Sequence, residues 1–168
     1  GHRKGVYDVR QAFSLAEFNV PVEMYLFGDG EFDKVRSVAE ASSRKEKIHV
    51  SGWLTHGEYL KRLVEFDLLV LPSYAETFGM SLVEAMGLGI PVISTFSGGV
   101  PYVVENGQDG FLIDAGDVQS LAEKLKILAD DDSLRIEMGK TAWKSCKTKF
   151  TGDVVLNLLE EYYQKMDG

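Results

Sequence analysis

Hydrophobic positions along the chain fall into two alternating patterns. Short apolar runs without polar alternation are typical of strands covered on both faces, whereas apolar residues three and four positions apart are typical of helices. The first pattern predicts strands at 22–30, 47–52, 67–72, 90–94 and 110–114. The second predicts helices at 5–18, 31–43, 56–66 and from residue 79 onward. Strands and helices therefore alternate along the first two thirds of the chain.

This alternation predicts an α/β fold. Strands joined through helices require right-handed crossovers and hence a parallel sheet. We expect one domain over residues 1–168, with a doubly wound, Rossmann-like parallel sheet and helices on both faces. Helices dominate after residue 117, and the Asp-Asp-Asp-Ser run at 130–133 supplies a break and capping residues. Because residues 1–5 lead directly into a helical pattern, we expect the first strand and a partner domain to lie upstream.

Composition and charge narrow the range of functions. The 45% hydrophobic and 26% charged residues are those of a soluble globular protein. A net charge of -8 argues against binding to nucleic acid or to an anionic membrane, because both need clustered Lys and Arg. The single Cys146 excludes an internal disulfide and a four-cysteine metal site. With no signal-peptide pattern and no apolar run near ~20 residues, we expect a cytoplasmic protein.

The candidate chemistry lies in residues 71–94. In open parallel sheets, ligands bind beyond the carboxyl ends of the strands, and the strand that ends at Pro72 leads through a loop into the helix near Gly79. The amides of Phe78, Gly79 and Met80 would stand free at the start of that helix, where the dipole also favours an anion. Glycine at this position would let the backbone approach a ligand closely. The segment therefore suits a phosphate group.

Two glutamates flank this helix start. Glu76 falls on the loop, and Glu84 lies roughly 7–8 Å along the helix, which is too far for the two to share a proton. They could bracket a nucleotide sugar, with sugar hydroxyls at Glu76 and the ribose diol at Glu84. In the ordinary interpretation Glu76 complements the helix dipole and Glu84 faces solvent, and spacing alone favours it. A glycosidase pair is discounted, because such carboxylates face each other across one bond.

Other chemical groups give weaker signals. The histidines, His2, His49 and His56, are scattered, with no Cys or carboxylate at ligand spacing, so we expect no metal site. His56 stands at an expected helix start, where capping is the default role and phosphate contact the alternative. Ser81 lacks a surrounding Gly-x-Ser-x-Gly turn, so hydrolase chemistry is not indicated. Gly28 belongs to a Gly-Asp-Gly turn that lacks the third glycine of a dinucleotide fingerprint, and we expect it to border the ligand cleft.

Residues 73–114 resemble the C-terminal, donor-binding domain of the retaining glycosyltransferases of family 4, which have the two-domain GT-B fold. The resemblance rests on the Glu, seven residues, Glu pattern at Glu76 and Glu84, the Gly-Gly-x-Pro turn at 98–101 and the Asn-Gly-x-x-Gly loop at 106–110. Three upstream segments also match in order: 26–30, 50–54 and 67–73. Nearly the whole chain is covered, which implies the C-terminal half of a GT-B fold.

The resemblance implies a role for each matching residue. It implies that Glu76 is the catalytic-site residue that positions the transferred sugar and that Glu84 holds the ribose. Five residues after Glu76 would contact sugar and phosphate through their backbone: Thr77, Phe78, Gly79, Met80 and Ser81. The lysine of an Arg, four residues, Lys pair that grips the diphosphate falls at Lys4, and its arginine would precede Gly1. Tyr102 stands where the family often has Glu, so no side-chain role is assigned there.

The resemblance also suggests which residues contact the nucleobase. Trp53 and Leu54 follow the strand that borders the base in the family, so they are candidates for base contact. Ordinary packing beneath a loop is an equally good interpretation of both residues.

The implied activity is a retaining, hexosyltransferase-like glycosyl transfer. A UDP- or GDP-linked sugar would be the donor and a saccharide or lipid-linked molecule the acceptor, in polysaccharide or glycolipid biosynthesis. The acceptor domain is N-terminal and absent from this chain, so we expect the isolated chain to be inactive. Membrane contact at the inner face would occur only through that domain. We expect no metal and no cofactor other than the donor substrate.

Two alternatives stay open. One is a nucleotide-sugar epimerase of the same fold, and the other is a non-catalytic nucleotide-sugar-binding module. An activity assay separates them, because an epimerase changes the donor without any acceptor.

Overall fold

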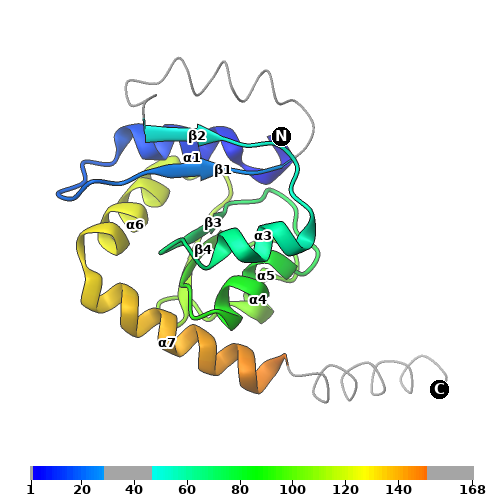
Figure 1. Ribbon diagram of the computed structural model, residues 1–168. Helices are drawn as coiled ribbons and strands as arrows, with labels where there is room; N and C mark the ends of the chain where they lie inside the picture. The colour runs from blue at the N-terminus through cyan, green and yellow to red at the C-terminus, as the bar shows by residue number, and fades with distance from the viewer. Residues whose placement is uncertain (1, 29–46, 151–168) are drawn as a thin grey trace.

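The structure is a computed structural model that describes residues 2–28 and 47–150 (Figure 1). The helix expected at 31–43 and the chain beyond residue 150 lie outside the described residues. The helical elements are η1 (His2–Lys4), α1 (Val6–Leu15), α3 (His56–Leu63), α4 (Met80–Gly87), α5 (Val100–Val103), α6 (Val118–Asp130) and α7 (Asp132–Lys149). The strands are β1 (Met24–Leu26), β2 (Ile48–Val50), β3 (Leu69–Leu71), β4 (Val92–Thr95) and β5 (Gly110–Ile113).

All of the described strands pair in parallel. β1 pairs with β2, with Met24 opposite Ile48. β3, β4 and β5 form a second sheet in that order, in which Val92 of β4 lies opposite both Leu69 and Gly110. One hydrophobic cluster contains residues of both sheets and joins them. The parallel sheet predicted from the alternation of elements is confirmed.

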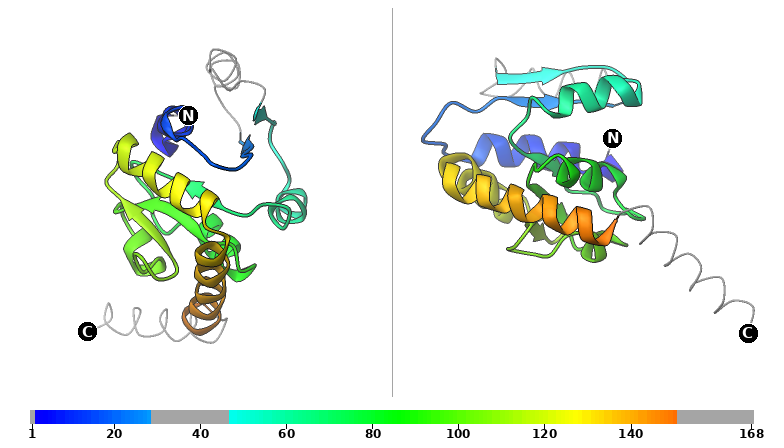
Figure 2. Two further views of the ribbon diagram at one scale, coloured as in Figure 1. Left: turned by 90° about the vertical axis from the view of Figure 1, so that its left-hand side faces the viewer. Right: turned by 60° about the horizontal axis from the view of Figure 1, so that its bottom comes forward.

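Helices cover both faces of the three-stranded sheet (Figure 2). Side chains alternate along each strand, and in β4 Val92 packs in the cluster that includes α3, α4 and α5, whereas Ile93 packs in the cluster that includes α1 and α6. β5 repeats the division with Leu112 and Ile113. α1 packs against α6, and α4 packs against α7. The doubly wound architecture is therefore confirmed.

Several element boundaries differ from those predicted. Each strand is shorter than the range predicted for it, because pairing with a neighbouring strand covers only part of the apolar run. The Gly-Gly-x-Pro turn leads into the short helix α5, which the sequence pattern did not predict. The break predicted at 130–133 is confirmed, since the Asp131 side chain accepts a hydrogen bond from the Leu134 amide and caps α7. None of the described helices is long and apolar enough to cross a bilayer.

The N-terminal segment docks against the loop that follows β3. The Tyr74 amide donates to the Arg3 carbonyl oxygen at 2.9 Å. Gly5 has a φ of 68°, and a Cβ atom at this position would lie 2.1 Å from the Pro72 carbonyl oxygen. Only glycine fits so close to another backbone in this conformation. This docking brings Lys4 to the carboxyl end of β3.

Candidate functional site

The loop from β3 to α4 ends at a glycine in the left-handed conformation. Gly79 precedes α4 with φ 86° and ψ 54°. A Cβ atom at Gly79 would also lie 2.8 Å from Leu82 Cδ1. The backbone conformation thus requires glycine here independently of any ligand, which adds to the reason given by the sequence. α4 then begins at Met80, close to the start predicted.

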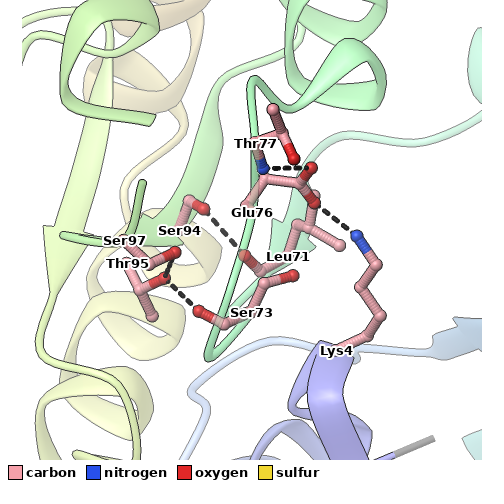
Figure 3. A network of polar contacts seen from close by, with 8 residues as sticks. All are labelled: Lys4, Leu71, Ser73, Glu76, Thr77, Ser94, Thr95 and Ser97. Carbon is pink, nitrogen blue, oxygen red and sulfur yellow. Dashed lines mark hydrogen bonds and ion pairs between the residues drawn. The ribbon is translucent and has the colours of Figure 1, made fainter. Parts of the chain in front are cut away.

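Side chains of β4 hold the chain as it leaves β3 (Figure 3). The Ser94 hydroxyl donates to the Leu71 carbonyl at 2.7 Å. The Thr95 hydroxyl donates to the Ser73 carbonyl at 2.6 Å, and Ser97 Oγ lies 3.0 Å from the same hydroxyl. These contacts satisfy backbone carbonyls at the end of β3 and just after it, so the loop that carries Glu76 starts from a fixed point.

The Gly-Gly-x-Pro turn fixes the same loop from the other side. The Gly99 amide lies 3.1 Å from the Thr77 carbonyl oxygen, to which it donates. Cβ atoms at Gly98 and Gly99 would lie 1.7 Å from the Glu76 carbonyl oxygen and 2.2 Å from the Thr77 carbonyl oxygen. The two glycines are therefore needed for backbone packing against Glu76.

The Asn-Gly-x-x-Gly loop also serves the local fold. Asn106 Oδ1 accepts a hydrogen bond from the Leu112 amide at 2.9 Å. Asp109 is fully buried, and its Oδ1 accepts from the Glu105 amide at 2.7 Å. Both side chains thus shape the turn before β5, and among the described residues no hydrogen bond links either of them to Glu76 or Glu84.

Glu76 is paired with a lysine that is distant in the sequence. Lys4 Nζ pairs with Glu76 Oε2, and the Thr77 amide donates to Oε1 at 3.1 Å (Figure 3). Only 13% of the Glu76 side chain is exposed. Burial raises the pKa of Glu76, but the hydrogen bond and charge of Lys4, together with the amides of Thr77 and Gly79, outweigh it and hold the pKa below its ordinary value. Glu76 is therefore an ionised carboxylate at neutral pH.

This arrangement affects one of the amides expected to bind phosphate. We expected the first-turn amides, including that of Gly79, to stand free for a phosphate. The Gly79 amide instead contributes to lowering the pKa of Glu76. Glu76 therefore places a negative charge beside the amide that precedes α4.

Glu84 is paired with a histidine from another helix. Its Oε1 lies 2.7 Å from His56 Nε2, at the start of α3, and only 20% of the Glu84 side chain is exposed. The ordinary interpretation of Glu84 as a solvent-facing residue is therefore wrong. The capping role expected for His56 is wrong too, since Thr55 caps α3 and forms a capping box with Glu58.

A tyrosine from α3 completes the polar surroundings of Glu84. Burial raises the pKa of Tyr59, the hydroxyl of Ser81 opposes that rise, and the charge of Glu84 adds to it. Tyr59 and His56 therefore face α4 from one helix, while Ser81 and Glu84 face α3 from the other. The sequence offered no signal for this pairing, because it arises from the packing of α3 against α4.

The remaining predicted residues are exposed or half-buried. Trp53 is 70% exposed and Leu54 is half-buried, and both precede the cap of α3. The Phe78 and Met80 side chains are exposed. A Cβ atom at Gly28 would meet no described atom within 4 Å. Across residues 2–28 and 47–150, no hydrogen bond or ion pair links Gly28 or Trp53 to either glutamate, so their roles stay predictions.

No metal centre is formed by the part of the chain that the structure describes. Within it, no three His, Cys, Asp or Glu side chains are grouped so that they could hold an ion. The polar site consists instead of two side-chain pairs, Lys4 with Glu76 and His56 with Glu84, whose glutamates lie on the loop and helix that follow β3.

Known proteins share this sequence and fold. Residues 1–145 match the family model of glycosyl transferases group 1. The chain is 32% identical over 161 residues to the N-acetyl-alpha-D-glucosaminyl L-malate synthase of Bacillus anthracis, a match that covers 95% of this chain and 42% of that protein. The chain thus spans less than half the length of this relative.

The fold also matches that of solved structures. Anabaena Alr3699/HepE in complex with UDP and glucose has a TM-score of 0.83 and 25% identity, covering 98% of this chain and 46% of that one. The C-terminal domain of the group 1 glycosyl transferase LpcC from Francisella tularensis has a TM-score of 0.82 and 22% identity, covering 90% of this chain and 82% of that one. The fold is that of the C-terminal half of GT-B glycosyltransferases, as predicted. The chain belongs to the glycosyl transferases group 1 family.

Proposed function

We propose that this chain is the donor-binding half of a retaining, hexosyltransferase-like glycosyltransferase. The observation that carries the proposal is the convergence of Lys4, Glu76 and the start of α4 beyond β3. A cation and a helix N-terminus suit a diphosphate, and an ionised carboxylate suits sugar hydroxyls. The donor is a nucleoside diphosphate sugar, and the acceptor is a saccharide or lipid-linked molecule bound by an N-terminal domain.

The chemistry follows from the charges at this loop. The acceptor hydroxyl oxygen forms the new bond to the sugar C1 as the bond between C1 and the diphosphate oxygen breaks. Negative charge develops on the leaving diphosphate, which takes up the hydroxyl proton. Lys4 and the amides at the start of α4 stabilise that charge, because they are held in place before the reaction begins. Glu76 accepts hydrogen bonds from sugar hydroxyls and orients the sugar. It does not act as a nucleophile, and no metal is required.

The nucleoside lies at the other end of the site. Glu84 binds the ribose hydroxyls, Trp53 and Leu54 line the base, and Gly28 borders the cleft. UDP is the first donor nucleotide to test, because the similar HepE structure holds UDP and glucose, and GDP is the second. The enzyme works in polysaccharide or glycolipid biosynthesis in the cytoplasm, with any membrane contact made by the N-terminal domain.

Calorimetric titration of the 168-residue chain with UDP, GDP and ADP tests the proposal, followed by titration with their glucose conjugates. We expect one nucleotide to bind without magnesium, its sugar conjugate to bind more tightly, and Glu84→Ala to weaken the binding. Failure of all three nucleotides to bind, or binding only with magnesium, would contradict the proposal. NMR of the product of the full-length protein then tests retention, and donor change without acceptor would identify an epimerase.

A further inference from the structure

The hydrogen bond between His56 and Glu84 has no role in the function proposed so far. His56 is the first residue of α3, and 69% of its side chain is exposed. Since Thr55 caps the helix, the imidazole is free of that task. Its Nε2 lies 2.7 Å from Glu84 Oε1, a contact between side chains 28 positions apart. The contact therefore depends on how α3 packs against α4.

The chemistry of the two groups fixes the direction of this hydrogen bond. An ionised carboxylate only accepts hydrogen bonds, so Nε2 carries the proton and donates it to Oε1. The bond leaves Oε2 and one lone pair of Oε1 available to other donors. A glutamate on a helix surface otherwise samples several rotamers, and ordering it costs free energy when a ligand binds. His56 removes part of that cost by holding the carboxylate beforehand.

We propose that His56 is a positioning residue that orients Glu84 toward the two ribose hydroxyls of the donor. In this way His56 sets the preference for ribonucleotide over deoxyribonucleotide donors. The inference rests on the proposed function, because it needs a nucleotide at Glu84. The charge of Glu84 also raises the pKa of Tyr59, which lies one turn further along α3. His56, however, is the α3 side chain at hydrogen-bonding distance from the Glu84 carboxylate.

Calorimetry with UDP and 2′,3′-dideoxy-UDP tests the role of His56. The unaltered protein is expected to prefer UDP. His56→Ala should weaken UDP binding roughly threefold to fivefold, less than loss of Glu84 itself, and leave the affinity for dideoxy-UDP unchanged, since only the ribose hydroxyls use the positioned carboxylate. His56→Gln should restore most of the preference, because the amide can donate to Oε1. His49→Ala is the matched control, a histidine on β2 that pairs with Glu23 at 3.2 Å.

Several outcomes would overturn the inference. Tighter binding of UDP by His56→Ala would mean that the histidine competes with the ribose for Glu84. Equal loss of UDP and dideoxy-UDP binding would mean a structural role, and an unchanged preference would mean no role. If the unaltered protein binds no nucleotide, the proposed function fails first. If it binds UDP and His56→Ala retains the full preference, this inference alone fails.

Discussion

Lys4 Nζ pairs with Glu76 Oε2 although 72 positions of sequence separate the two residues. Two backbone contacts bring them together, since Gly5 packs against Pro72 and the Tyr74 amide donates to Arg3. Half of the Lys4 side chain is exposed, whereas Glu76 is mostly covered. Lys4 is thus accessible from solvent while Glu76 is held in place, which is the arrangement that the proposed contact of Lys4 with a diphosphate needs.

Replacement of Lys4 should weaken binding of the diphosphate specifically. Lys4→Gln keeps much of the side-chain length but removes the charge, and we expect UDP affinity to fall about tenfold or more, as for loss of one charged hydrogen bond. Uridine, which lacks phosphate, should bind as before. Calorimetry with both ligands measures the difference, and Lys140→Gln on α7 is the control. A similar loss of uridine binding would show that Lys4 acts through the fold.

Replacement of Glu76 and replacement of Glu84 should change the binding of UDP and UDP-glucose in different ways. Glu84→Ala removes the ribose acceptor and should weaken UDP binding about tenfold. Glu76→Ala should leave UDP binding nearly unchanged but abolish the extra affinity that glucose adds in UDP-glucose. Paired titrations of each variant with UDP and UDP-glucose measure both effects. Equal loss of UDP binding in the two variants would rule out this division of roles.

The sequence predicted which elements carry Glu76, Gly79 and Glu84, but not which side chains pair with the two glutamates. The places of Glu76 on a loop, Gly79 at a helix start and Glu84 within the helix follow from local patterns, and the structure confirms them. The contact of His56 with Glu84 depends on the packing of two helices that are separate in the sequence. Local propensity carries no information about such a contact, because tertiary packing determines it.

Dependence on tertiary contacts also explains why α5 was not predicted. α5 is only four residues long, and it begins directly after two glycines that are held by Thr77 and Glu76. Glycine and proline normally signal a turn. Here the close fit of Gly98 and Gly99 to another backbone leaves Pro101 in the first turn of a helix, where its missing amide costs nothing.

The stability contributed by Glu76 should depend on pH. Its pKa is lower in the folded protein than its ordinary value, so folding is favoured by the ionised form above the ordinary pKa. This contribution is lost as pH falls through the folded pKa. Lys4 and Glu76 form a partly exposed pair, so we expect about 0.5–1 kcal/mol.

Chemical denaturation at pH 7 and pH 3 measures this contribution. The difference in unfolding free energy between the unaltered protein and Glu76→Gln should shrink at pH 3. Taking the difference cancels the pH-dependent contributions of Glu58, Asp117 and Asp130, whose pKa values are also lowered. A difference that stays constant or grows on acidification would contradict the prediction.

Gly98 should be far less tolerant of substitution than a glycine of the same conformation elsewhere. Gly98 has φ 54° and Gly107 has φ 82°, so alanine strains the backbone at both. At Gly98 the added Cβ would also lie 1.7 Å from the Glu76 carbonyl oxygen, whereas at Gly107 it would meet no described atom within 4 Å. We expect Gly107→Ala to cost about 1 kcal/mol and Gly98→Ala at least ~2 kcal/mol. Urea denaturation compares them, and equal losses would mean that the fit against Glu76 is unimportant for stability.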